Sequence, residues 1–231
     1  MPTPLRWLLG SLLLAALLCL SQGAWGHEVS VEDASFLAKK EGFIFWPYFY
    51  LGAKHMFTGL DHLLFLAGVI FFLYRPRDVA LYVTLFAIGH SLTLVVGVWF
   101  RIPANPYLVD AVIGFSVMYK AFENLGGFKA LDLSISSHGA VFFFGLCHGL
   151  GLATKLQQIT LSDQGLLGNL IAFNLGVEAG QLTVLSIMLV VILVWRRRST
   201  FRREATLANA VLVTAGCLLT ATQLSYYLGA S

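Results

Sequence analysis

Histidines and carboxylates stand at several points inside long apolar runs of this chain. His55, Asp61 and His62 lie in LGAKHMFTGLDHLLFLAG, for example, and His90 lies in LFAIGHSLTL. The groups of this kind are His55, Asp61, His62, His90, His148 and Glu178. A carboxylate at membrane depth costs at least about 2.5 kcal/mol, so such groups are by default functional or tightly paired. Because imidazole and carboxylate together bind divalent first-row metals such as nickel, zinc or iron, these residues predict a metal site within a membrane.

The spacing of the first three groups favours a path over a single cage. His55 and His62 are seven positions apart, so in a regular helix they share one face about two turns apart. They cannot both bind one ion in that geometry, and successive sites along a path fit the spacing better. Asp61 points about 100° away from His62, which allows it to act as a partner of the histidine, a proton carrier or a ligand.

Glycines surround two of these groups. A G-x-x-x-G arrangement spans residues 145–149 around His148, and another spans residues 176–180 around Glu178. Such arrangements allow helix backbones to approach closely in lipid, which would bring ligands from different helices together. The alternative is a purely structural network of buried polar groups.

Composition places the chain in a membrane. Of its 231 residues, 58% are hydrophobic and 12% are charged, whereas soluble domains are about a quarter charged. The net charge is +3, with arginines that cluster instead of covering a face. This balance excludes a disordered chain, a coiled coil and a nucleic-acid-binding protein. The sequence predicts a polytopic membrane protein whose surroundings are the lipid bilayer.

Long apolar runs give the expected elements of an all-α membrane helix bundle. Helices are expected because a chain in lipid must satisfy its own backbone hydrogen bonds, and the runs lack the alternation of a barrel strand. Pro76 and the pair Pro103 and Pro106 punctuate the gaps. The six expected transmembrane helices, which together form a domain over residues 49–231, lie at about 49–74, 78–100, 107–126, 137–156, 165–195 and 206–228.

The first 26 residues are typical of a secretory signal peptide. Arg6 precedes the apolar segment 8–20, and Ala24-Trp25-Gly26 provides a small-x-small cleavage site. An uncleaved anchor helix is the alternative. Residues 27–48 are then expected to form a short periplasmic segment. Cleavage after Gly26 would leave His27 with an amine and an imidazole that could both bind metal.

Arginines predict the orientation of the bundle. Arg75 and Arg77 lie between the first two expected helices, and the run 196–203 lies between the last two. With six helices both loops, and the loop with Lys129, fall on one side, which the positive-inside rule assigns to the cytoplasm. We therefore expect a multi-pass protein of the bacterial cytoplasmic (inner) membrane with both termini in the periplasm.

The polar motifs resemble those of a known family. The string His55-x-x-x-Gly59-x-Asp61-His62-x-Leu64-Phe65-Leu66 is similar to the signature of the HupE/UreJ membrane proteins, the hydrogenase and urease accessory family. The segments Gly89–Leu94, Glu123-Asn124, His148–Gly151 and 173–181 also resemble that family, in the same order.

This resemblance implies a secondary permease for nickel, with cobalt as a related substrate and metalloenzyme maturation factors as partners. Nickel permeases of another type carry an H-x-x-x-x-D-H motif, whereas His55 lies six positions before Asp61 here. No P-loop is present, so transport would be facilitated or ion-coupled instead of driven by nucleotide hydrolysis.

Two other functions fit the same residues. An intramembrane zinc-dependent metallohydrolase would use three protein ligands and an open position for activated water. A metal-binding accessory protein would hold the ion without transporting it. One tight tetrahedral site open to lipid would favour the enzyme, and sites along an aqueous path would favour the permease. We expect a transporter, and we assign no catalytic residue.

Overall fold

The computed structural model describes residues 42–157 and 164–230. Within these ranges the chain forms eight helices and no strand. The expected signal peptide over residues 1–26, His27 and most of the expected periplasmic segment lie outside the described residues, so they remain predictions.

The helices follow the expected apolar runs to within two residues, except in the first run and in the last, where the helix begins at Phe201 instead of about residue 206. They are α3 (Phe45–Thr58), α4 (Leu60–Ile70), α5 (Pro76–Trp99), α6 (Pro106–Asn124), α7 (Gly127–Ala130), α8 (Ser137–Gln157), α9 (Leu166–Arg196) and α10 (Phe201–Ala230). Prolines open α5 and α6, where a missing backbone N–H costs nothing. The side chain of Asn105 caps α6 by accepting hydrogen bonds from the backbone N–H groups of Tyr107 and Leu108, at 3.0 and 3.3 Å.

Four of the described helices are long and apolar enough to cross a membrane: α5, α8, α9 and α10. The first expected span is interrupted, because α3 ends at Thr58 and α4 begins at Leu60. The third, α6, carries the charged residues Asp110, Lys120 and Glu123 within one helix. Length and composition alone therefore do not identify the interrupted first span or the charged third span as helices that cross a membrane.

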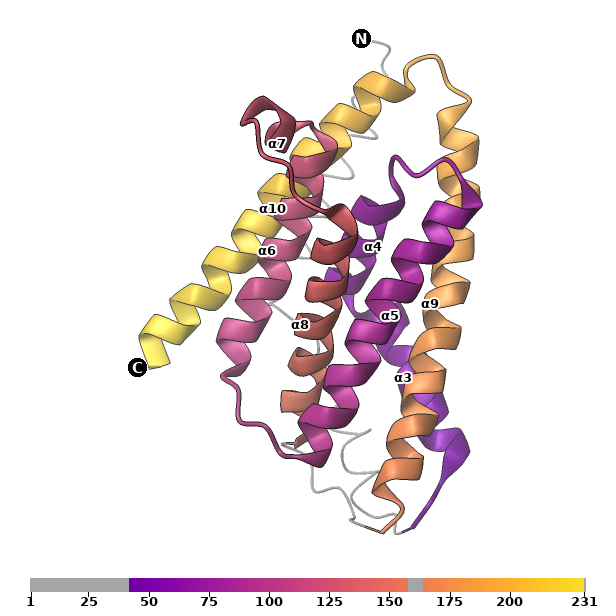
Figure 1. Cartoon of the computed structure of the whole chain (residues 1–231), viewed down its shortest axis with the longest axis vertical. Helices are drawn as coiled ribbons and strands as arrows, with labels where there is room; N and C mark the ends of the chain where they lie inside the picture. The colour runs from indigo at the N-terminus through magenta and orange to yellow at the C-terminus, as the bar shows by residue number, and fades with distance from the viewer. Residues whose placement is uncertain (1–41, 158–163, 231) are drawn as a thin grey trace.

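Helices pack in close pairs around a common interior. α5 packs on α8, α6 on α10 and α3 on α9. Figure 1 shows α5 and α9 running between the two ends of the bundle, whereas α3 lies in one half of it. Glycines lie at all three contacts. A Cβ on Gly89 would lie 2.6 Å from the carbonyl oxygen of Phe142, and one on Gly114 would lie 2.8 Å from the backbone nitrogen of Thr220. Because such distances exclude a side chain, glycine allows these backbones to touch.

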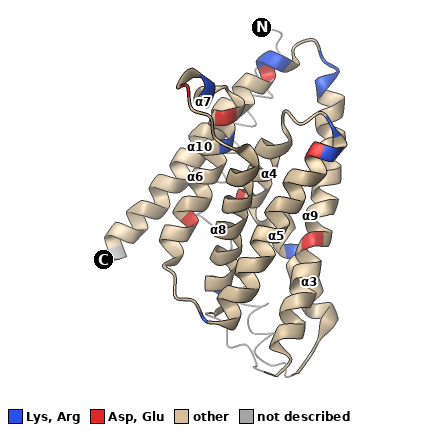
Figure 2. Cartoon of the chain, in the orientation of Figure 1, with Lys and Arg blue, Asp and Glu red and all other residues tan. Residues whose placement is uncertain are grey.

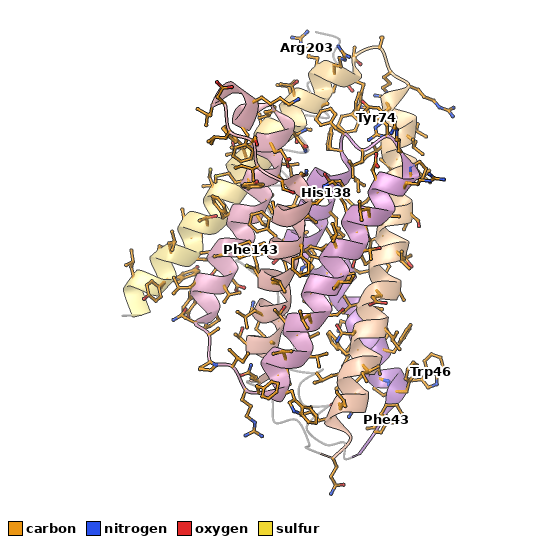
Figure 3. All side chains as sticks on the ribbon, in the orientation of Figure 1. Phe43, Trp46, Tyr74, His138, Phe143 and Arg203 are labelled. Atoms are coloured by element: carbon orange, nitrogen blue, oxygen red, sulfur yellow. The ribbon has the colours of Figure 1, made fainter. Side chains whose placement is uncertain are left out.

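The two ends of the bundle differ in charge. Lys and Arg residues gather where α9 ends and α10 begins and at the start of α5, as Figure 2 shows. We call this the arginine end; it carries Arg75, Arg77 and the run 196–203. Tyr74 and Arg203 lie at this end in Figure 3, whereas Trp46 and Phe43 are exposed at the opposite end. Aromatic residues at both ends are typical of the two interfaces of a membrane protein.

Candidate metal centre

The break between α3 and α4 occurs beside the histidines. α3 is followed by Gly59, whose backbone is extended (φ −73°, ψ 92°) and whose N–H donates to the carbonyl oxygen of His55 at 2.9 Å. α4 begins at the next residue and carries Asp61 and His62 in its first turn. A Cβ on Gly59 would lie 3.2 Å from Nδ1 of His62 and 3.4 Å from Oδ1 of Asp61. Glycine therefore gives the two helix ends room to meet.

Three histidines converge at this break. His55, His62 and His90 each offer a ligand nitrogen, and these three nitrogens lie within 4.8 Å of one another. All three side chains are buried, His62 at 0% and His90 at 1% exposed. Neutral imidazoles at this separation can act as ligands to one divalent ion after a small adjustment. The interpretation of His55 and His62 as successive sites is therefore corrected, since it assumed a regular helix.

His148 adds a fourth ring from α8. The ring centroid of His62 lies 4.8 Å from that of His148 and 5.6 Å from that of His90, so side chains from three helices lie close together. Nδ1 of His148 lies 2.8 Å from the carbonyl oxygen of Phe144. Because a carbonyl only accepts, this contact puts the proton on Nδ1 and the lone pair on Nε2, the tautomer suited to a metal ligand.

Asp61 holds His62 in place. Oδ1 of Asp61 accepts a hydrogen bond from the backbone N–H of His62 at 2.8 Å and lies 3.2 Å from Nδ1 of the imidazole ring of His62. A carboxylate on one ring nitrogen orients the imidazole and makes the other nitrogen more basic. Of the three roles considered for Asp61, the geometry favours that of a partner of the histidine. We name these five residues, His55, Asp61, His62, His90 and His148, the histidine cluster.

Close packing of α5 against α8 brings His90 and His148 together. A Cβ on Gly145 would lie 2.5 Å from the carbonyl oxygen of Phe86, and Gly149 packs directly against the carbonyl group of His90. Thr93 ties the two helices by donating from Oγ1 to the carbonyl oxygen of Leu146 at 2.7 Å. The expected close approach around His148 is confirmed.

Glu178 does not join the cluster. It is exposed on α9, and no hydrogen bond or ion pair links its carboxylate to another described residue. Gly176 and Gly180 do allow a close approach, but they face Phe49 and Ala53 of α3. A residue two positions from each glycine points about 200° away from them, so Glu178 faces outward. The expectation that it shares the interior with the histidines is corrected here.

One buried charge was missed by sequence reasoning. Lys120 of α6 is 6% exposed, inside the bundle and toward the arginine end. Its position within the apolar run 107–126 was the signal that could have identified it, since a lysine at membrane depth also requires partners.

Comparison with known proteins gives one family. The family model described as "HupE / UreJ protein" matches residues 31–231, nearly the whole chain, and every residue of the histidine cluster lies inside that range. No curated protein and no solved structure matches the chain.

Proposed function

Because the chain belongs to the HupE/UreJ family, we propose that it is a secondary permease for a divalent transition metal ion, with nickel as the first candidate. The observation that carries the proposal is the convergence of the nitrogens of His55, His62 and His90 to within 4.8 Å of one another at a buried position. In this proposal the ion exchanges part of its water shell for these imidazoles and the ring of His148.

The donor set suits a carrier. A carrier must bind an ion tightly enough to select it and weakly enough to release it. Neutral imidazoles bind nickel, cobalt and zinc, whereas a thiolate cage would retain a soft ion. Cys147, the cysteine next to His148, does not belong to the triad whose ligand atoms converge.

The proposed topology has six membrane segments, with α3 and α4 together forming the first. The proposed location is the bacterial cytoplasmic membrane, with the arginine end in the cytoplasm and both termini in the periplasm. Concentration of Lys and Arg at one end of the bundle supports this orientation. Metalloenzyme maturation factors are the proposed cytoplasmic recipients of the ion.

The compactness of the triad favours a second candidate function, that of an intramembrane zinc-dependent hydrolase. Three histidines around one ion resemble a catalytic zinc site, which also needs an open position and access for substrate. Burial of all four rings of the histidine cluster argues for an enclosed ion over an exposed catalytic centre.

Uptake of Ni²⁺ into proteoliposomes tests the permease. We expect saturable uptake by the full chain, lost in His62→Ala, whose ring centroid lies within 5.6 Å of those of His55, His90 and His148. The matched variant His90→Gln keeps a polar side chain of similar size but lacks the imidazole, and should lose uptake as well. Metal binding without any uptake would reject the permease and leave the hydrolase and the accessory protein.

A further inference from the structure

Lys120 contacts three of the helices that carry the histidine cluster, near their arginine end. Its stem packs against α4, where a Cβ on Gly68 would lie 3.3 Å from Cγ of the lysine. Its ammonium lies 5.4 Å from the ring centroid of Tyr82 on α5 and donates to Oγ of Ser137, the first residue of α8, at 3.0 Å. One side chain thus contacts three helices, and each of them also supplies a histidine.

A carboxylate completes this arrangement. Nζ of Lys120 donates to Oε2 of Glu123 at 2.6 Å, one turn further along α6. The side chain of Glu123 is 23% exposed, whereas that of Lys120 is 7% exposed, so the pair lies where the interior meets the arginine end. Two oxygens, one charged and one neutral, therefore hold a cation at this point.

Aromatic rings lie between the histidine cluster and the pair formed by Lys120 and Glu123. The ring centroid of Phe65 lies 5.3 Å from that of Phe86 and 5.9 Å from that of Phe144. It also lies 5.3 Å from that of His148, so the aromatic layer begins at the histidine cluster. Phe65 and Phe86 are at most 1% exposed. Such an apolar layer blocks an ion in the observed conformation.

The same order recurs on three helices: a histidine, a phenylalanine, then a contact with Lys120. The residues are His62, Phe65 and Gly68 on α4, His90, Phe86 and Tyr82 on α5, and His148, Phe144 and Ser137 on α8. The histidine cluster, the aromatic layer and the lysine are therefore stacked along one axis toward the arginine end.

We propose that Glu123 and Ser137 form a second, weaker site for a divalent cation, and that the ammonium of Lys120 occupies it in this closed conformation. An ion leaving the histidine cluster displaces the ammonium and binds these oxygens before release at the arginine end. One carboxylate and one hydroxyl bind nickel less tightly than imidazoles do, which suits a release site. This inference rests on the proposed function, because it assigns the exit of the same path.

Binding of Ni²⁺ alone tests the site independently of transport. The full chain with His62→Ala, which weakens the histidine cluster, is the background for equilibrium dialysis. Adding Lys120→Met removes the competing charge, and we expect Ni²⁺ to bind about tenfold tighter than in the background. Lys120→Gln, whose amide can still donate to Glu123, should give the same gain if the methionine variant does not fold.

Two controls define the outcome. Lys120→Arg keeps the charge and should bind as the background does, and adding Glu123→Gln to Lys120→Met should abolish the gain. Unchanged Ni²⁺ affinity in both uncharged variants would overturn the second site. Absence of Ni²⁺ uptake by the unmodified chain would instead reject the permease while leaving this binding result intact.

Discussion

The imidazole rings of His55 and His62 lie 5.1 Å apart, centroid to centroid, although seven positions separate them in the chain. In an uninterrupted helix the same residues would be separated by about 10 Å along the axis. The break at Gly59 accounts for the difference, since it ends α3 one turn after His55 and starts α4 just before His62. The compact histidine cluster therefore depends on the interruption between α3 and α4.

Gly59→Ala tests this dependence. The new methyl group would lie 3.1 Å from the carbonyl oxygen of His55 and 3.2 Å from Nδ1 of His62, which is tighter than usual contact. We expect a folded protein with about tenfold weaker Ni²⁺ binding, because ligands displaced from their productive geometry lose affinity steeply. Gly139→Ala is the matched control, since its nearest neighbour would be 3.7 Å away. Equal affinities for the two variants, by calorimetry, would contradict the role of the break.

Asp61→Asn tests the support of His62. The substitution keeps the shape of the side chain but removes the negative charge beside Nδ1 of His62. We expect Ni²⁺ affinity to fall about ten- to hundredfold, the usual effect of losing a carboxylate behind a histidine ligand. Asp78→Asn, in the first turn of α5 and remote from the cluster, should bind Ni²⁺ normally. Undiminished binding by Asp61→Asn would show that the carboxylate does not support the site.

Glu178→Gln separates the buried cluster from the exposed face of α9. Because Glu178 is exposed and lies opposite the glycines that contact α3, we expect the variant to bind Ni²⁺ with the affinity of the unmodified chain. Equilibrium dialysis of the purified protein measures this directly. Loss of binding in a folded variant would mean that the carboxylate reaches the histidines in some other conformation.

Gly145→Ala tests the packing that brings two ligands together. Its methyl group would lie 2.5 Å from the carbonyl oxygen of Phe86, so α5 and α8 must separate. Overpacking of this kind costs about 1–3 kcal/mol. We expect a lower midpoint of thermal unfolding in detergent together with weaker Ni²⁺ binding, neither of which Gly139→Ala should show. An unchanged midpoint would indicate that the helix pair tolerates the added volume.

Much of the fold follows from the sequence, because apolar run length and proline position are local signals. Pro76 and Pro106, expected in the gaps before two helices, are the first residues of α5 and α6, and the arginine loops share one end of the bundle as expected. The interruption at Gly59 was not predicted, since a single glycine within an apolar run is compatible with a continuous helix. The break depends on contacts between residues that the sequence does not place side by side.

The candidate site, like the fold, follows only in part from the sequence. Membrane depth identified the four histidines of the cluster, because a buried polar group requires a partner whatever its neighbours are. Membrane depth does not say which way a side chain points around its helix. Glu178 was therefore grouped with the histidines, although it faces away from them. Lys120 was overlooked because its partners Ser137 and Tyr82 come from other helices, so spacing within α6 does not identify them.

X-ray absorption of the purified protein loaded with one equivalent of Ni²⁺ tests whether the histidine cluster is the metal centre. We expect three or four imidazole ligands at about 2.0–2.1 Å, the usual metal–nitrogen distance, with the imidazole signal reduced in His62→Ala. His138→Ala, whose exposed ring stacks on Tyr82 outside the cluster, should leave the spectrum unchanged. A spectrum without imidazole scattering, or one that His62→Ala does not alter, would contradict the assignment of the histidine cluster as the metal centre.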